Sequence, residues 1–226
     1  MFDFQTQTFL SDGVLSPAEL ARRAKVNGYT ALAITDHVGL TDQDRVLETL
    51  VRECAALTQT LNMLVIPGVE LTHVAKDSID AAARRAKKMG AALVLVHGET
   101  IVEPVEKGTN LAALMSDYVD ILAHPGLISQ QLVKLAAQRG KFLELSARRG
   151  HSLTNGHIAN LARESKALLL LNSDAHGPED LLTPSLAKAI AHGAGLTVAE
   201  ARQVLKHNPQ TLLARLNLPG PHHKSA

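Results

Sequence analysis

Histidine, aspartate and glutamate recur along this chain in short motifs that follow runs of apolar residues. The motifs are Thr35-Asp36-His37, Gly68-Val69-Glu70, His97-Gly98-Glu99, Ala123-His124-Pro125-Gly126 and Ser173-Asp174-Ala175-His176. Imidazole and carboxylate together form a mixed ligand set that suits Zn, Mn or Fe(II). A hydrophobic interior could not accommodate so many ionisable groups without partners, and divalent cations would supply them. The residue types therefore predict a metal site.

The elements that must position these residues are short, almost continuously apolar runs. The runs cover residues 1–4, 29–35, 63–67, 91–96, 119–123, 142–145 and 167–171. Near-continuous apolarity is typical of strands that are buried on both faces of a parallel sheet. Each candidate ligand follows such a run, so we expect it at the end of a strand.

Helical patterns separate the apolar runs. Residues 77–88 place four apolar side chains on one face, and Ser16-Pro17-Ala18-Glu19 and Thr197-Val198-Ala199-Glu200 have the form of capping boxes. Alternating strands and helices predict an α/β fold with a parallel sheet. An open doubly wound sheet usually carries a Gly-rich phosphate loop after its first strand, and residues 5–13 do not form one. We therefore expect a single distorted TIM-like parallel (β/α)7 barrel.

In such a barrel the carboxyl ends of the strands meet at one rim. That rim would collect the candidate ligands Gln5, Gln7, Asp12, His37, Glu70, His97, His124, Asp174 and His176. Asp12 lies in Ser11-Asp12-Gly13, which is also a favourable turn sequence, so a ligand role and a turn role both remain open. We expect His73 in a loop and His157, His192 and His207 on the surface.

The ordered series of motifs resembles the PHP family, named for polymerase-associated and histidinol phosphatase domains. The resemblance runs from Asp3 to Asn208-Pro209. It implies a distorted barrel of about seven strands and two to three divalent metal ions, Zn, Mn or Fe. The first ion would use Gln5, Gln7, Glu70 and Asp174, the second Glu70, His97 and His124, and the third Asp12, His37 and His176.

The chain departs from the family at the first ion. Family members begin with His-x-His where this chain has Gln5-Thr6-Gln7. A glutamine offers only its carbonyl oxygen as a practical ligand. That oxygen is a weaker donor than imidazole for Zn or Fe and more compatible with Mg or Mn. We therefore expect a weak or empty first site, with the other two retained.

Two arginines follow the sixth predicted strand. Arg148 or Arg149 could bind a phosphate through paired N–H donors, or both could belong to a solvated loop. Glu144 could orient a ligand histidine or pair with an arginine, and Glu99 could support a ligand in the same way. His37 or His176 could protonate a leaving group.

The resemblance implies a hydrolase of the histidinol-phosphatase-like branch, a metal-dependent phosphoesterase that cleaves a small phosphomonoester by metal-activated hydroxide. Two alternatives remain open. The altered Gln5 and Gln7 fit a catalytically inactive metal- or phosphate-binding domain. The family also contains nucleases that act on nucleic-acid ends.

The composition sets outer limits on these hypotheses. The chain has 226 residues, of which 46% are hydrophobic, and this suits one domain over residues 1–218 with a disordered tail over 219–226. A net charge of +1 argues against nucleic acid and anionic membranes as partners. The single Cys54 cannot form an internal disulfide. We find no leader and no membrane-length apolar run, so we expect a cytoplasmic protein with a small phosphorylated substrate.

Overall fold

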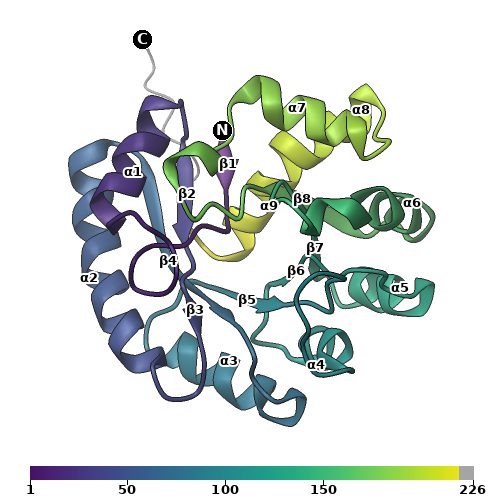
Figure 1. Cartoon of the computed structure of the whole chain (residues 1–226), viewed down its shortest axis with the longest axis horizontal. Coiled ribbons are helices and arrows are strands. Elements are labelled where there is room, and N and C mark those ends of the chain that lie inside the picture. Colours follow the sequence, from purple (N-terminus) through teal and green to yellow (C-terminus); the bar gives the residue numbers. More distant parts are fainter. Residues whose placement is uncertain (219–226) are drawn as a thin grey trace.

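The protein folds into a nearly closed barrel of parallel strands, seen end-on in Figure 1. The computed structural model describes residues 1–218, so the expected tail at 219–226 lies outside the described residues. The strands are β1 (Phe2–Asp3), β2 (Ala31–Ile34), β3 (His37–Val38), β4 (Leu64–Leu71), β5 (Leu93–His97), β6 (Ile121–Ala123), β7 (Phe142–Ser146) and β8 (Leu168–Asn172).

The strand order confirms the predicted barrel. The order is β1-β2-β4-β5-β6-β7-β8, and the short β3 resumes the path of β2 and pairs with β4. A parallel bridge between Thr6 and Ala175 joins the ends of β1 and β8. The backbone N–H of Gln7 donates to the Ala175 carbonyl at 2.8 Å, and that of Asp174 donates to the Gln5 carbonyl at 3.1 Å. The barrel therefore closes at its carboxyl end, where the candidate ligands lie.

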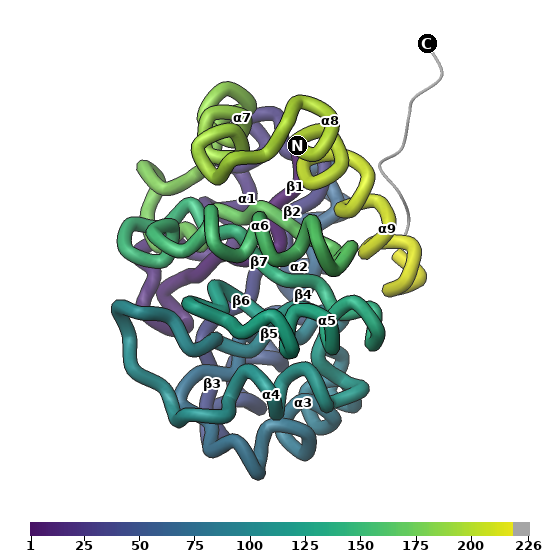
Figure 2. The backbone as a smooth tube through the Cα atoms, turned by 90° about the vertical axis from the view of Figure 1, so that its right-hand side faces the viewer, coloured from purple at the N-terminus to yellow at the C-terminus, as the bar shows by residue number. Residues whose placement is uncertain are grey.

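Helices surround the barrel, and α4, α5 and α6 succeed one another along one side (Figures 1 and 2). The α-helices are α1 (Pro17–Val26), α2 (Gln43–Leu61), α3 (Ile79–Lys88), α4 (Thr109–Met115), α5 (Gln130–Gln138), α6 (Asn155–Ser165), α7 (Pro184–Gly193), α8 (Val198–Arg202) and α9 (Asn208–Arg215). Shorter 3-10 turns are η1 (Lys76–Ser78), η2 (His151–Thr154) and η3 (Pro178–Asp180), and a π-helical segment, η4 (Gln203–His207), joins α8 to α9.

The two capping signals differ in outcome. Thr197 and Glu200 form the full reciprocal capping box of α8. Ser16 accepts the backbone N–H of Glu19 at the start of α1, but the Glu19 carboxylate binds Arg23 one turn later. The capping box predicted at Ser16 is therefore only half formed.

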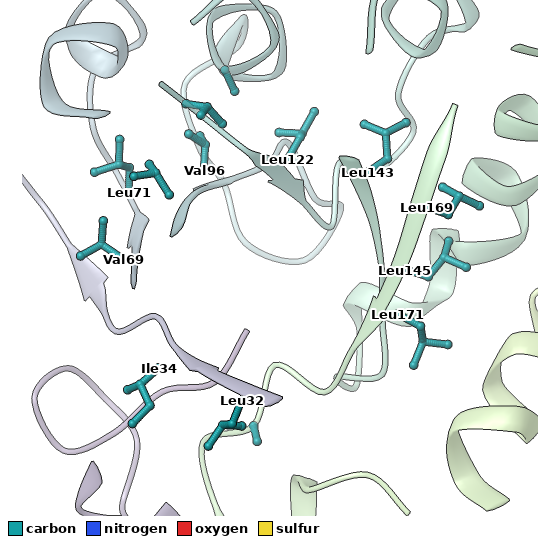
Figure 3. Close-up of a cluster of buried hydrophobic side chains, with 14 of the residues drawn as sticks. Leu32, Ile34, Val69, Leu71, Val96, Leu122, Leu143, Leu145, Leu169 and Leu171 are labelled. Atoms are coloured by element: carbon teal, nitrogen blue, oxygen red, sulfur yellow. The ribbon is translucent and has the colours of Figure 1, made fainter. Parts of the chain in front are cut away.

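Side chains on successive strand positions divide into two apolar layers. Leu32, Val94, Leu122, Leu143 and Leu171 belong to the cluster between the strands and the helices. Figure 3 shows this outer layer, with side chains pointing away from the strands toward the helices. The intervening positions, Ala31, Ala33, Ile66, Leu93, Leu95, Ile121, Phe142 and Leu170, fill the interior together with Leu212 and Leu213 of α9. Strand residues alternate between faces, which explains the division.

The same alternation carries polar residues into the barrel above the inner apolar layer. His97 continues the inward series of Leu93 and Leu95, and Glu144 follows Phe142. Both are buried, His97 at the end of β5 and Glu144 within β7. An ionisable group in such a place needs a partner, because desolvation of an unpaired charge is costly.

Cys54 is a free, buried thiol within α2. Over the described residues, the structure has no helix whose length and apolar character would let it cross a bilayer.

Candidate metal centre

All nine candidate ligands gather at the carboxyl end of the barrel. Gln5, Gln7 and Asp12 come from the loop after β1, and the others from β3, β4, β5 and the segments after β6 and β8. Five of the nine, together with His151, form two groups, which we call the rim cluster (Asp12, His37 and His176) and the inner cluster (His97, His124 and His151). In each cluster, one ligand atom from every residue lies within 4.8 Å of the other two.

The rim cluster is the more exposed of the two. Nε2 of His176 lies 3.3 Å from Oδ2 of Asp12, and Nε2 of His37 lies 3.7 Å from Oδ1 of the same carboxylate. The Thr72 hydroxyl lies 2.6 Å from Nδ1 of His37. This contact fixes the ring and leaves Nε2 facing Asp12, as an outer partner does for a metal-binding histidine.

Asp36 holds the loop that carries Asp12. Its buried carboxylate accepts hydrogen bonds from the backbone N–H and hydroxyl of Thr8, at 2.7 and 2.8 Å, and from the backbone N–H and hydroxyl of Ser11, at 3.1 and 2.7 Å. Asp12 therefore lies in a turn, and this turn also places its carboxylate beside His37 and His176.

The inner cluster contains a histidine to which the sequence assigned no role. His151 begins η2, five residues beyond β7, and is 2% exposed. Its ring stacks on that of His124 with centroids 4.0 Å apart. Glu103 was also missed, although its Oε2 lies 2.9 Å from Nε2 of His97. The signal for His151 was its place after a strand on the same rim as Arg148, whereas Glu103 lies in a loop that no strand pattern locates.

Unusual backbone conformations turn two of the candidate ligands inward. His124 has a φ of 24° and Asp174 a φ of 54°, in the left-handed region that non-glycine residues rarely adopt. His124 follows the inward-facing Ala123, so strict alternation would send its side chain out of the barrel. Strain of this kind persists where surrounding structure imposes it, and it is concentrated at functional sites.

Gln5 and Gln7 turn their amide groups toward Glu70. Nε2 of Gln5 donates to Oε2 of Glu70 at 2.6 Å, and Nε2 of Gln7 donates to the same oxygen at 3.0 Å. The two carbonyl oxygens have no hydrogen-bond partner among the described residues. The amides thus face Glu70 with their N–H donors instead of the carbonyl oxygen that a metal ion would require.

The pKa values of two buried carboxyl groups in the pocket shift in opposite directions. Burial opposes ionisation of Glu70, but His37, His124 and His97 hold the pKa of this carboxyl below its usual value. Burial raises the pKa of Asp174, and Glu70 adds to the effect. His124 is also buried, yet its contact with Glu70 raises the pKa of its imidazole to about 9. Burial and His124 together lower the pKa of His151 to about 3.

The two arginines that follow β7 have different surroundings. Nη1 of Arg148 lies 2.6 Å from Nδ1 of His176 and 3.4 Å from the Asp174 carbonyl oxygen. Arg148 lines the same pocket of about 190 Å³ as both clusters. Arg149 is exposed and is not among the residues that line this pocket.

The two supporting glutamates bind backbone groups. Glu144 accepts the backbone N–H of His124 at 3.1 Å and the Asn172 amide at 2.7 Å, and burial raises the pKa of its carboxyl to about 8. It therefore positions His124 and forms none of the ion pairs with arginine found among the described residues. Glu99 accepts the backbone N–H groups of Gly108 and Asn110, and so supports a loop.

The other histidines lie outside both clusters. His73 is an exposed loop residue whose ring centroid lies 6.2 Å from that of His97. His157 and His192 are exposed on α6 and α7, and His207 is half-buried in η4.

The donor set fits divalent metal ions. Oε1 of Glu70 and Oδ1 of Asp174 are buried and have no hydrogen-bond partner among the described residues. Unpaired buried acceptors are costly, and cations close to them would remove the cost. Both clusters combine imidazole with nearby carboxylate, the ligand set of Zn, Mn and Fe(II).

Known proteins resemble this chain in sequence and in fold. An uncharacterized protein of Methanocaldococcus jannaschii is 46% identical over 216 residues, which cover 95% of this chain and 99% of that protein. Ribonuclease P protein component 3 of Methanosarcina barkeri is 28% identical over 227 residues, covering 94% of this chain and 88% of its own length.

Among solved structures, histidinol phosphate phosphatase of Lactococcus lactis, in complex with zinc, L-histidinol and phosphate, superposes with a TM-score of 0.62. The match covers 87% of this chain and 94% of that one at 11% identity, so it shows the shared fold. The PHP domain family model matches residues 3–212. Since that match covers more than nine-tenths of the chain and all nine candidate ligands, this chain belongs to the PHP domain family.

Proposed function

We propose that this protein is a metal-dependent phosphoesterase that hydrolyses a small phosphomonoester. The observation that supports it best is a single pocket lined by both histidine clusters and by Arg148. Such a pocket would combine metal ligands with a cation for the phosphate, the parts that phosphoryl transfer requires. The zinc and phosphate bound by the histidinol phosphate phosphatase of the same fold support the same class of reaction.

Each residue of the site would have a separate role in hydrolysis. Asp12, His37 and His176 would hold one ion, and Glu70, His97 and His124 another. Divalent ions at these places would supply Lewis acidity and activate water. Arg148 would donate paired N–H groups to the phosphate oxygens and stabilise their charge. In an arrangement in which the rim cluster holds no ion, His37 or His176 would instead protonate the leaving oxygen.

A panel of small phosphomonoesters, including an aryl phosphate and histidinol phosphate, tests this function. We expect turnover with Mn or Zn and its loss with a chelator. Arg148→Ala should raise KM roughly tenfold or more, since a hydrogen bond to a charged group contributes about 1.5–3 kcal/mol. The matched control Arg149→Ala removes the same charge outside the pocket and should leave KM unchanged.

Two outcomes would count against the proposal. A protein that binds metal and phosphate but turns over no phosphomonoester is a binding domain, as the altered Gln5 and Gln7 also allow. An unchanged KM for Arg148→Ala would remove this residue from the substrate site and leave phosphate to the ions alone.

Nucleic acid is a second candidate ligand, because ribonuclease P protein component 3 is a relative over most of the chain. This relative does not support the expectation, drawn from a near-neutral charge, that nucleic acid is an unlikely partner. Binding to RNA and to DNA ends should be measured at several salt concentrations. Proteins that neutralise many backbone phosphates lose affinity steeply as salt rises, whereas binding of a small ester involves one phosphate and should weaken much less.

A further inference from the structure

The inner cluster contains an imidazole, that of His151, that the proposed function does not use. That proposal assigns Glu70, His97 and His124 to the ion at this place. His151 brings a third buried ring nitrogen to His97 and His124, all three within 4.8 Å of one another. Their side chains are 1–2% exposed. Each ring comes from a different segment: His97 from the end of β5, His124 from the turn after β6, and His151 from the start of η2.

The contacts of His97 cannot all be satisfied by a neutral imidazole. Nδ1 lies 3.1 Å from the Gly98 carbonyl oxygen, and Nε2 lies 2.9 Å from Oε2 of Glu103. A neutral imidazole has only one N–H, so one of its nitrogens directs a lone pair at an oxygen that also can only accept. A metal ion on Nε2 resolves this conflict, because Nδ1–H then donates to Gly98 and Glu103 faces a cation. This is the arrangement in which metal-binding histidines usually occur.

His151 is oriented in a similar way. Its Nδ1 lies 2.8 Å from the Thr100 hydroxyl, which holds the ring. Its Nε2 lies 3.7 Å from Oε1 of Glu103 and 3.8 Å from Oδ2 of Asp174. Both distances are too long for hydrogen bonds. The nitrogen therefore points into a space bordered by two carboxylates, and this space attracts a cation.

On the opposite side of the pocket, one of the two Glu70 oxygens already has hydrogen-bond donors. Oε2 of Glu70 accepts hydrogen bonds from the side-chain amides of both Gln5 and Gln7. The partial positive charge of these N–H groups balances part of the carboxylate's negative charge. Gln5 also directs its Nε2 to within 3.3 Å of Nε2 of His124. Among the described residues, no amide N–H faces His151 or Glu103 on the side where they approach His97, so these two side chains can still accept a cation.

We propose that His97, His124, His151 and Glu103 bind one transition-metal ion. His151 and Glu103 complete a four-coordinate site in place of the Glu70 carboxylate, whose Oε2 already accepts hydrogen bonds from Gln5 and Gln7. A tetrahedral zinc ion with bonds of about 2.0–2.1 Å holds its ligand atoms roughly 3.4 Å apart, so small side-chain rotations close these residues around it. Three imidazoles favour Zn or Co over Mg. This proposal concerns metal binding alone and does not depend on the phosphoesterase activity.

The test is a Co²⁺ titration of protein from which a chelator has removed all metal, followed by visible absorption and by metal content. It compares variants that remove a ligand with variants that remove only a partner of that ligand. His151→Ala should lose one equivalent of ion, or bind it far more weakly. Thr100→Val removes only the partner of the His151 ring and should weaken binding by roughly 10- to 100-fold. His73→Asn is the matched control. It removes an imidazole near His97 at a position whose φ of 54° suits asparagine, and it should leave both ions unchanged.

Nitrogen NMR of the unaltered protein provides a measurement that needs no folded variant. On addition of Zn²⁺, ring nitrogens of His97, His124 and His151 should shift together, as coordinated imidazoles do. The proposal is overturned if His151 resonances stay in place while zinc binds, or if folded His151→Ala keeps both stoichiometry and affinity. Neither readout involves turnover, so absence of phosphatase activity would leave this result standing.

Discussion

At the scale of single residues, Gln5 and Gln7 decide how the charge of Glu70 is balanced. Both amides donate to one carboxylate oxygen, where imidazoles would instead offer lone pairs to an ion. The neutral amides thus supply partial positive charge without binding metal. We therefore expect these two positions to determine whether the pocket takes up a further ion.

The double change Gln5→His, Gln7→His should therefore add one ion per chain. Imidazole binds Zn, Mn or Fe more strongly than an amide carbonyl does, and Oε2 of Glu70 would be released from both hydrogen bonds. An added Lewis acid can contribute several kcal/mol at the transition state, so we expect roughly a hundredfold or greater gain in kcat with Mn or Zn. Turnover of an aryl phosphate and metal content measure the two effects.

The control for this experiment is Gln5→Asn, Gln7→Asn, which shortens both amides without offering imidazole. It should gain neither an ion nor activity. An added ion without added turnover would place the defect elsewhere and favour a binding domain. Equal turnover in the starting protein would mean that these residues do not limit catalysis.

At the scale of elements, the loops after β5 and β6 are packed directly on each other. Gly126 has a φ of 64°, and a Cβ atom placed there would lie 2.0 Å from the Glu99 carbonyl oxygen. Pro125 and Gly126 follow His124, and Gly98 and Glu99 follow His97, so this contact sets the separation of two inner-cluster ligands. The turn therefore requires glycine for both conformation and space.

Gly126→Ala should lower the free energy of unfolding by roughly 3 kcal/mol, from left-handed strain and overpacking together. Gly156→Ala is the matched control, since it adds the same methyl group in α6, where the nearest atom would be 3.9 Å away. That change should be neutral or stabilise by up to about 1 kcal/mol. Urea unfolding of both variants measures the difference, and equal midpoints would show that the loop contact can yield without cost.

At the scale of the whole molecule, the barrel should be stable without its ions. Its two apolar layers, the closure between β1 and β8, and the amide contacts of Glu70 are all formed by side chains and backbone. Metal ions then stabilise the folded state by mass action. Free ion at a hundred times Kd contributes about 2.7 kcal/mol.

A chelator should consequently lower Tm by roughly 5–10 °C, since each kcal/mol shifts Tm by about 2–4 °C in a domain of this size. The far-UV circular dichroism at 25 °C should not change. Loss of that signal on chelation would show that the ions are structural and that the protein does not fold without them. A Tm that is independent of metal would show that neither cluster binds an ion tightly.

Local sequence patterns were enough to predict the barrel and most of its rim. Apolar runs and helical periodicity are local patterns, and parallel strands bring their carboxyl ends together whatever the loops do. For this reason the pattern of strands alone located His37, Glu70, His97 and His176 at the rim. Arg148 was located in the same way, since it directly follows β7.

Contacts between distant segments determine which of these residues face one another, and only the folded chain reveals them. His151 and Glu103 were missed because their positions depend on loops far apart in sequence, such as the Thr100 hydroxyl at the His151 ring. The inward turn of His124 depends on a φ of 24° that no local pattern reveals. The orientation of the Gln5 and Gln7 amides depends on Glu70, more than sixty residues away. The strand pattern determines where the backbone of a residue lies, because it is local. Long-range packing and charge determine which way its side chain points and what it contacts.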